Sequence, residues 1–228
     1  MNIRECYLNG IRPDDLKIID AHAHIGHSAG CHIPLESTEE GIRRMESLGI
    51  SAMCASHLTA LGGDVEAGNK MLFELCDKYP GKVYGHVFYD PRCPEISIGD
   101  IEKYKNHPGF VGIKIHPRES FTNLSDDGYR PLWEYADENK LIVTSHTWET
   151  EPMNDPALFF DICNKYSNMI IILAHCGGTY LGYETCYRLV KEYPNVYLDL
   201  NGFIYCCQWI EQVVERINGV DRIVFGTD

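Results

Sequence analysis

Residues 169–175, MIIILAH, form an unbroken apolar run that ends in a single histidine. A short apolar run without polar alternation is typical of a strand that is buried on both faces of a parallel sheet. Seven further β-rich runs occur along the chain. They are residues 17–24 (KIIDAHAH), 50–57 (ISAMCASH), 82–89 (KVYGHVFY), 110–116 (FVGIKIH), 141–146 (LIVTSH), 195–200 (NVYLDL) and 222–226 (RIVFG). The sequence therefore predicts eight strands.

Amphipathic segments lie between these runs. We predict that Thr38 is the N-cap of a helix that ends at Gly49. The other predicted helices cover residues 66–79, 97–106, 127–139, 156–166, 183–193 and 206–218. Strands that alternate with helices predict an α/β fold with a parallel sheet, and eight such units favour a TIM-like (β/α)8 barrel. An open, doubly wound sheet is the alternative, although no glycine-rich phosphate loop follows the first strand.

The chain length of 228 residues and a hydrophobic content of 44% fit one domain, predicted to cover residues 1–228. Asp228 is the last residue and follows the eighth predicted strand directly. A complete barrel has a helix after that strand. We therefore expect either a truncated chain that lacks the final helix or an N-terminal segment that covers the gap.

The composition indicates which binding partners and which cellular compartment the protein is expected to have. The formal net charge of −13 disfavours a general affinity for nucleic acid or for anionic membranes, because both carry phosphates. The N-terminus has no apolar signal region, and no apolar run reaches the roughly 18 residues of a membrane helix. The ten cysteines include no CxxC pair, so we expect reduced thiols in the cytoplasm and no thiolate zinc site.

Two histidines stand near the end of the first predicted strand. Because side chains on a strand alternate, we expect Asp20, His22 and His24 to share one face. Neutral imidazoles at such a spacing can bind one metal ion, although two histidines in a polar loop would look the same. Asp20 is predicted either to orient a ligand histidine by a hydrogen bond or to make a strand-end contact.

Later strands also end in single polar residues. His146, His175 and Asp228 follow the fifth, sixth and eighth apolar runs. In a barrel the carboxyl ends of all strands converge on one mouth, where active sites lie. Four histidines and one aspartate at converging ends favour a metal site. The predicted ligands are His22, His24, His146, His175 and Asp228.

This order of ligands resembles the amidohydrolase superfamily. The segments DAHAHIG (20–26), GIKIHP (112–117), AHCGG (174–178) and RIVFGTD (222–228) resemble its amidohydrolase-2 branch, which includes relatives of aminocarboxymuconate-semialdehyde decarboxylase. The resemblance covers about residue 18 to residue 228. It implies a TIM-like barrel, hydrolysis or related chemistry, and a divalent ion such as zinc, manganese, iron or cobalt. One ion is favoured over two, and a homodimer is compatible with the resemblance.

A mechanism follows as a hypothesis. His22, His24 and either His146 or His175 would hold the ion, and an ion with an open position lowers the pKa of bound water to about 7. Asp228 would contact the ion or its water and act as general base. By analogy with the family, His175 would lie closer to the substrate, so Asp228 and His175 are the predicted catalytic residues.

Four further residues are predicted to contact the substrate. Lys114 and His116 are two residues apart on the fourth strand, and a lysine that points into a barrel needs a carboxylate or a substrate as partner. Carboxylation of Lys114, as in two-metal relatives, is the alternative. His116 and Arg118 suit a substrate carboxylate, and His57 ends the second strand.

The sequence thus favours a metal-dependent hydrolase that acts on a small, anionic substrate with a carbonyl group, such as an amide, lactone or ester. One alternative is a non-oxidative decarboxylase on the same metal site. Another is a truncated, non-catalytic metal-binding barrel.

Overall fold

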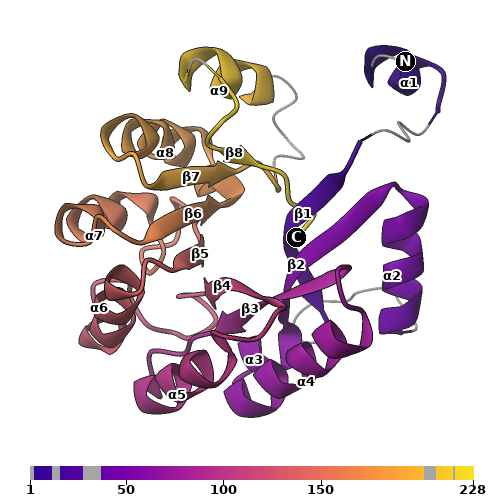
Figure 1. Ribbon diagram of the computed structural model, residues 1–228. Helices are drawn as coiled ribbons and strands as arrows, with labels where there is room; N and C mark the ends of the chain where they lie inside the picture. The colour runs from indigo at the N-terminus through magenta and orange to yellow at the C-terminus, as the bar shows by residue number, and fades with distance from the viewer. Residues whose placement is uncertain (1–2, 12–15, 28–36, 203–208, 218) are drawn as a thin grey trace.

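Eight parallel strands in chain order make the centre of the molecule (Figure 1). The computed structural model describes residues 3–11, 16–27, 37–202, 209–217 and 219–228. The strands are β1 (Ile18–Ile25), β2 (Ile50–His57), β3 (Val83–Phe88), β4 (Phe110–Ile115), β5 (Ile142–His146), β6 (Ile170–Ala174), β7 (Val196–Asp199) and β8 (Ile223–Val224). Each strand of this list is hydrogen-bonded in parallel to the next. All eight predicted strands are therefore confirmed.

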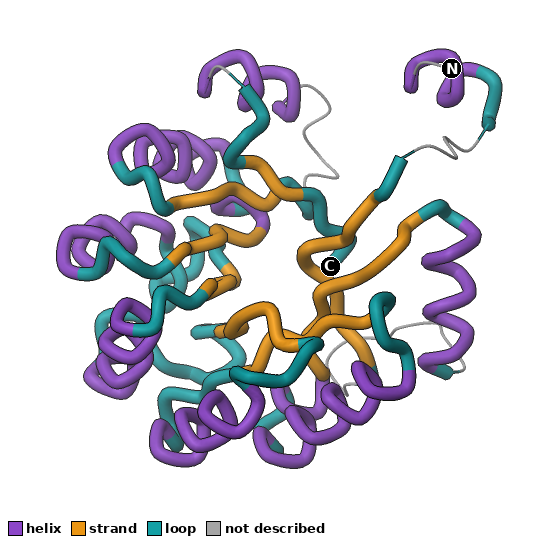
Figure 2. The backbone as a smooth tube through the Cα atoms, in the orientation of Figure 1, coloured by secondary structure: helices purple, strands orange, loops and turns teal. Residues whose placement is uncertain are grey.

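Helices lie outside the strands, and most of them cover the barrel wall, while the N-terminal helix stands apart from it (Figure 2). They are α1 (Ile3–Leu8), α2 (Thr38–Ser47), α3 (Leu58–Leu61), α4 (Val65–Lys78), α5 (Pro94–Tyr104), α6 (Arg130–Glu138), α7 (Phe159–Lys165), α8 (Tyr180–Glu192) and α9 (Trp209–Ile217), with 3-10 turns η1 (Asp127–Tyr129), η2 (Pro156–Leu158) and η3 (His175–Gly177). The prediction of Thr38 as N-cap is wrong by one residue, because the Ser37 side chain accepts the N–H of Glu40. The short helices α1 and α3 were not predicted. The start of the predicted helix 206–218 lies outside the described residues.

The core lies between the strands and the helices. Ile113 and Ile115 of β4 are fully buried on the outer face of the barrel, as the alternation along this strand predicts. Ile171 and Leu173 of β6 are buried in the same way and belong to the same apolar cluster. Burial of each such side chain contributes roughly 1.5–3 kcal/mol, so this layer fixes the orientation of the strands and leaves the alternate residues to face the interior.

Backbone hydrogen bonds join the two ends of the sheet. The Ala21 N–H donates to the Phe225 carbonyl at 2.8 Å, and the N–H groups of Thr227 and Asp228 donate to the His22 carbonyl at 3.1 and 2.8 Å. In Figure 1 the C-terminus accordingly lies beside β1. These bonds bring the end of β8 to β1, which identifies the fold as a nearly closed (β/α)8 barrel and excludes an open doubly wound sheet.

The register of β1 contains an irregularity in front of the two histidines. Asp20 pairs with Met53 and Ala23 pairs with Ala55, so β1 takes three steps where β2 takes two. Such a bulge reverses the alternation of side chains. Asp20 therefore lies on the same outer side as Met53, and the expectation that it shares a face with His22 and His24 is wrong.

Two remaining observations concern the cysteines and membrane segments. The seven cysteines among the described residues are all free thiols, and five of them are buried.

In the part of the chain that the structure describes, no helix is both long and apolar enough to cross a membrane.

Replacement of Thr227 by valine tests the closure of the barrel. The Thr227 hydroxyl donates to Oδ2 of the buried Asp20 at 2.5 Å, so Thr227→Val leaves that carboxylate without one donor. We expect a loss of about 1–3 kcal/mol in the free energy of unfolding, measured by urea denaturation. The matched control is Thr185→Val, whose hydroxyl makes an exposed bond on α8. Equal effects of the two substitutions would contradict this role.

Candidate metal centre

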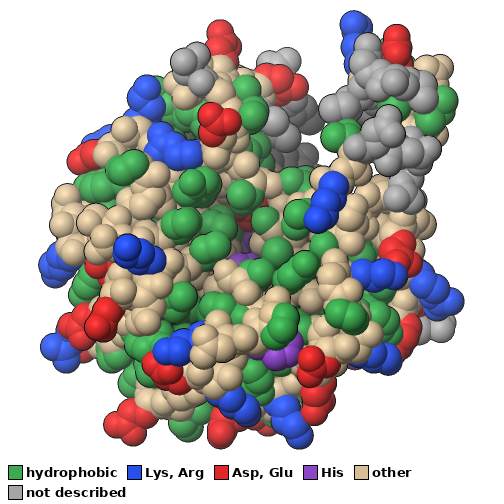
Figure 3. Space-filling view, viewed as in Figure 1, with side chains coloured by type: hydrophobic (Ala, Val, Ile, Leu, Met, Phe, Trp, Pro, Cys, Tyr) green, Lys and Arg blue, Asp and Glu red, His purple; other side chains and the backbone are tan. Residues whose placement is uncertain are grey.

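Three side chains from distant parts of the chain meet at the end of the barrel. One ligand atom each of His22, His175 and Asp228 lie within 4.8 Å of one another. The Asp228 Oδ1 atom is 3.4 Å from His22 Nε2 and 3.2 Å from His24 Nε2. The structure therefore brings together four of the five predicted ligands, from β1, from the turn after β6 and from the segment after β8. Histidine side chains are visible at depth near the middle of the face shown in Figure 3.

The turn after β6 directs His175 into this cluster. His175 has a φ of 60°, and Cys176, Gly177 and Gly178 follow with φ values of 46°, 80° and 69°. Two successive non-glycine residues in the left-handed region are strained, and such strain often accompanies functional sites. A Cβ at Gly178 would lie 2.2 Å from a ring atom of Trp148, so the Cys-Gly-Gly sequence lets the turn pack tightly beside the site.

His146 lies next to the cluster and not within the group of three. Its ring stacks on His116 with a centroid distance of 3.9 Å, and it meets the His175 ring edge-on at 4.7 Å. The His146 Nε2 atom is buried without a hydrogen-bond partner among the described residues, and the nearest carboxylate oxygen, of Glu151, is 3.6 Å away. An unpartnered imidazole nitrogen beside a metal site is compatible with the predicted ligand role, which stays a prediction.

Lys114 points into the interior of the barrel. Its side chain is fully buried, and its Nζ contacts His22 Nε2. Burial lowers the pKa of Lys114 to about 8, while the charges of Asp228 and Asp199 oppose this shift. The lysine thus has carboxylates nearby, as its burial requires.

Asp199 at the end of β7 is a site residue that the sequence analysis missed. Its Oδ2 atom is 2.7 Å from His22 Nδ1, and its side chain is completely buried. Burial raises the pKa of Asp199 to about 7, against the hydrogen bond from Asn201 N–H and the charge of Lys114. A weaker signal was present, because Asp199 is the one charged residue in the run NVYLDL (195–200), where only Leu200 follows it.

The other predicted residues have different surroundings. His57 accepts the N–H of Thr59 at 3.2 Å, which caps α3, and its ring packs on Gly26, where a Cβ would lie 2.6 Å from the ring. Arg118 is largely exposed and donates to Glu151 Oε1 at 2.7 Å.

Asp20 makes the strand-end contact that was one of its two predicted roles. Its Oδ1 atom accepts the backbone N–H groups of His22 at 3.0 Å and of Thr227 at 3.2 Å. It therefore orders the backbone of both segments and does not touch the His22 ring by any bond among the described residues.

The electrostatics of the cluster favour a bound cation. Burial lowers the pKa of His22, His24, His116 and His146, and lowers that of His175 to about 4, so these imidazoles are neutral at pH 7. Burial alone would raise the pKa of Asp228, but its bond with His24 and the charge of Lys114 hold that pKa below its usual value. Neutral imidazoles with an ionised carboxylate are the donors that zinc and related divalent ions prefer, so these residues fit such an ion.

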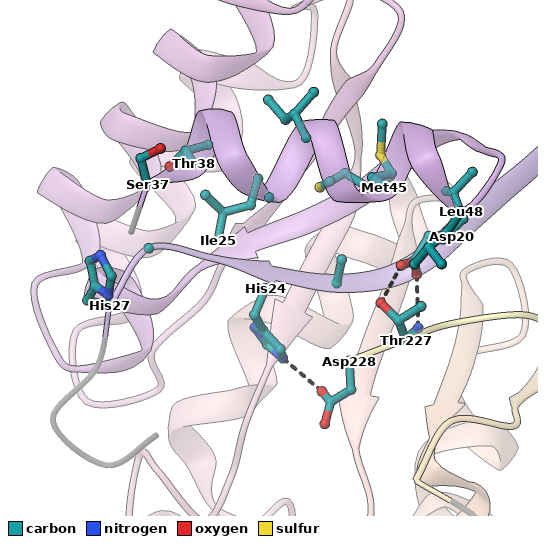
Figure 4. A pocket seen from close by; sticks show the side chains of 16 residues that line it. Asp20, His24, Ile25, His27, Ser37, Thr38, Met45, Leu48, Thr227 and Asp228 are labelled. Atoms are coloured by element: carbon teal, nitrogen blue, oxygen red, sulfur yellow. Dashed lines mark hydrogen bonds and ion pairs between the residues drawn. The ribbon is translucent and has the colours of Figure 1, made fainter. Parts of the chain in front are cut away.

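A cavity of about 420 Å³ lies between α2 and β1, next to the cluster (Figure 4). Apolar side chains such as Ile25, Met45 and Leu48 form most of its wall. His24 and Asp228 point toward each other at its inner side, and the pair of Asp20 and Thr227 lies farther along β1. The cavity is therefore outside the barrel wall but shares two residues with the metal cluster.

Comparison with known proteins gives one family. The family model Amidohydro_2, described as amidohydrolase, matches residues 19–228. No curated protein is significantly similar in sequence.

Several solved structures share the fold. A 5-carboxyvanillate decarboxylase from Novosphingobium aromaticivorans, complexed with manganese and 4-hydroxy-3-methoxy-5-nitrobenzoic acid, has a TM-score of 0.72 at 17% identity over 95% of this chain and 87% of its own. A 2,6-dihydroxybenzoate decarboxylase from Rhizobium has a TM-score of 0.71 at 17% identity over 93% and 87%. A probable 2-pyrone-4,6-dicarboxylic acid hydrolase from Acinetobacter baumannii with citric acid bound has a TM-score of 0.69 at 14% identity over 93% and 84%. At sequence identities this low, the similarity to these structures shows a shared fold and nothing more.

The buried histidines predict a pH dependence of stability. Burial and the charge of Lys114 lower the pKa of His86 on β3 from 6.5 to about 4. Below pH 6.5 the unfolded chain binds a proton that the folded chain does not bind until about pH 4, so stability falls as the pH falls through this window. The shift corresponds to roughly 3 kcal/mol.

We expect His86→Gln to reduce the loss of unfolding free energy between about pH 7 and about pH 4, measured by urea denaturation of the metal-free protein. His107→Gln, at a partly exposed position, controls for the removal of a histidine. An unchanged pH dependence in His86→Gln would show that His86 is not buried in its neutral form.

Proposed function

Because the chain belongs to the amidohydrolase family Amidohydro_2, we propose that it is a metal-dependent hydrolase that acts on a small, anionic substrate with a carbonyl group, such as a lactone, amide or ester. The observation that carries this proposal is the meeting of His22, His175 and Asp228 within 4.8 Å, with His24 against the same carboxylate. The family and its fold neighbours support an enzyme, and the donor set supports a bound ion.

The ion would be held by His22, His24 and Asp228, with His175 or His146 as a further ligand. Zinc, manganese, iron and cobalt all suit these donors, and the manganese in the 5-carboxyvanillate decarboxylase structure supports that metal among them. One ion is proposed because one group of ligand atoms occurs within the described residues. When bound, it would supply a Lewis acid that polarises a carbonyl and makes water more acidic.

Side chains of the protein itself would accept and donate the protons of the reaction. The Asp228 carboxylate is ionised and its side chain is 42% exposed, so it can accept a proton from water at the mouth. His175 is neutral at pH 7 and can donate one ring N–H to a substrate oxygen. Lys114, with a pKa of about 8, remains mostly charged at pH 7 and would stabilise negative charge that develops on the substrate.

The mouth of the site has the shape and charge for a flat anion. The rings of His116, His146 and Trp148 are nearly parallel, with interplanar angles of 14° and 7° between neighbours. A planar substrate can stack on such rings. Arg118 donates a hydrogen bond to Glu151, and a substrate carboxylate would compete with Glu151 for the guanidinium.

Non-oxidative decarboxylation on the same site is the second candidate function. It is favoured by the decarboxylases among the fold neighbours and by the stacked rings, which suit an aromatic carboxylate. The two reactions differ in product, because a hydrolase consumes water and splits one bond whereas a decarboxylase releases carbon dioxide.

Metal content of the untagged protein tests the site. We expect one divalent ion per chain by elemental analysis, and its loss in the double variant His22→Ala/His24→Ala. His107→Ala, away from the cluster, should keep the ion. Two ions per chain would instead favour a site bridged by carboxylated Lys114. No bound ion after incubation with zinc or manganese would contradict the proposed metal site.

Turnover assays separate the candidate reactions. The metal-loaded protein is offered carboxylate-bearing lactones, esters and amides with product detection by chromatography, and aromatic carboxylates with detection of carbon dioxide. We expect product from the first set, and a loss of at least about 100-fold in kcat in Asp228→Asn because the proton acceptor is removed. Asp221→Asn, at an exposed position, is the control.

If carbon dioxide is released and no hydrolysis product forms, the decarboxylase is the correct function and the hydrolase proposal is wrong. A metal-loaded protein that turns over neither set would favour a non-catalytic metal-binding barrel. Full turnover in Asp228→Asn would contradict the role of Asp228 in either reaction.

A further inference from the structure

We propose that Asp199 is a positioning residue that fixes the tautomer of His22, so that the His22 Nε2 lone pair faces the metal cluster. This inference rests on the proposed metal site. Asp199 was not among the predicted ligands, and its carboxylate touches the opposite side of the His22 ring from that cluster.

The two ring nitrogens of His22 have partners of opposite chemical character. On one side, the Asp199 Oδ2 atom is 2.7 Å from Nδ1. The charge of Lys114 favours the ionised form of this carboxylate, and in that form it can only accept a hydrogen bond. On the other side, the Lys114 Nζ contacts Nε2, and an ammonium group can only donate. Both contacts require the same tautomer, with the proton on Nδ1 and the lone pair on Nε2, and both are shorter than the 3.4 Å between Nε2 and the Asp228 Oδ1 atom.

The surroundings hold Asp199 in place. Its Oδ1 atom accepts the backbone N–H of Asn201 at 3.2 Å, which anchors the carboxylate on the turn after β7. Gly226 packs directly against the pair, because a Cβ there would lie 2.8 Å from His22 Cβ and 2.9 Å from Asp199 Oδ1. The Asn201 Nδ2 atom is 2.5 Å from His22 Nδ1, and the Asn201 Oδ1 atom is buried without a hydrogen-bond partner among the described residues. Exchange of the amide nitrogen and oxygen gives the ring N–H an acceptor at this position.

His24 offers a useful contrast within the same cluster. Its Nδ1 atom is 3.0 Å from the Ser56 hydroxyl, which can either donate or accept a hydrogen bond. The contact with Ser56 is compatible with either tautomer of His24. On the Nδ1 side, His22 therefore has a partner that selects a tautomer, and His24 does not.

The chosen tautomer matters because only a nitrogen with a lone pair can bind a cation. With the proton on Nε2, the ring would present an N–H to the ion, and the Asp199 carboxylate would face the lone pair of Nδ1. Carboxylate partners of ligand histidines also make the ring a better donor, and their loss typically lowers metal affinity 10–100-fold. An ion would take the place of the Lys114 ammonium at Nε2.

Nitrogen NMR of the wild-type, metal-free protein reads the tautomer directly. With 15N-labelled histidine, the two-bond couplings from the ring protons distinguish a protonated nitrogen from a nitrogen with a lone pair. We expect the His22 signals, assigned by their loss in His22→Gln, to show the proton on Nδ1. A proton on Nε2 would overturn the proposal, whether or not the protein binds metal.

Cobalt titration tests the consequence for binding. We expect Asp199→Asn and Asp199→Ala to weaken Co²⁺ binding about 10–100-fold and to alter the visible absorption of the bound ion, because the His22 donor changes. The matched control is Asp100→Asn, which removes a buried carboxylate bonded to Asn69 at 2.9 Å and should leave Co²⁺ affinity unchanged.

The outcomes separate this inference from the proposed function. Wild-type Co²⁺ affinity and absorption in a folded Asp199→Ala protein, which has no acceptor at this position, would overturn the positioning role. If the Asp199 variants do not fold, the wild-type NMR measurement decides. A wild-type protein that binds no Co²⁺ would count against the proposed metal site, while the tautomer measurement would still confirm or refute the role of Asp199.

Discussion

The carbonyl oxygen of His22 accepts hydrogen bonds from the backbone N–H groups of Thr227 and Asp228, and the candidate site depends on this contact. It ties the first strand to the segment after the last one, across more than 200 residues of sequence. The Asp20 carboxylate reinforces the same junction through the backbone N–H and hydroxyl of Thr227. Because the junction includes His22 and Asp228 themselves, closure of the barrel also brings these two residues of the cluster together.

The interior of the barrel holds buried charged groups that need partners. A buried ammonium on Lys114 and a buried carboxylate on Asp199 lie on opposite sides of the neutral His22 ring. Each charge would be costly alone, and the arrangement offsets part of that cost through a chain of hydrogen bonds. The same arrangement leaves neutral imidazole rings beside the ionised Asp228 carboxylate. A divalent cation needs such neutral nitrogen donors and a negatively charged oxygen.

Much of this could be predicted from the sequence, because strand ends in a parallel barrel converge whatever their spacing along the chain. The eight strands follow from continuous apolar runs, and four of the five predicted ligands meet. The position of Asp20 could not be predicted, since a bulge reverses its side and no residue type marks the bulge. Asp199 was missed because it was counted inside the predicted strand 195–200, in which Leu200 still follows it. The His146 stack on His116 depends on side-chain rotation, which the sequence pattern does not specify.

Anomalous X-ray diffraction from crystals grown with manganese or zinc would test the account most directly, because it locates the ion and identifies the element. We predict one strong anomalous peak in contact with His22 Nε2 and the Asp228 carboxylate, with His24 and His175 around it. A peak on His146 and His116 with no density at His22 would contradict the account. Crystals without any peak at the barrel mouth would contradict it as well.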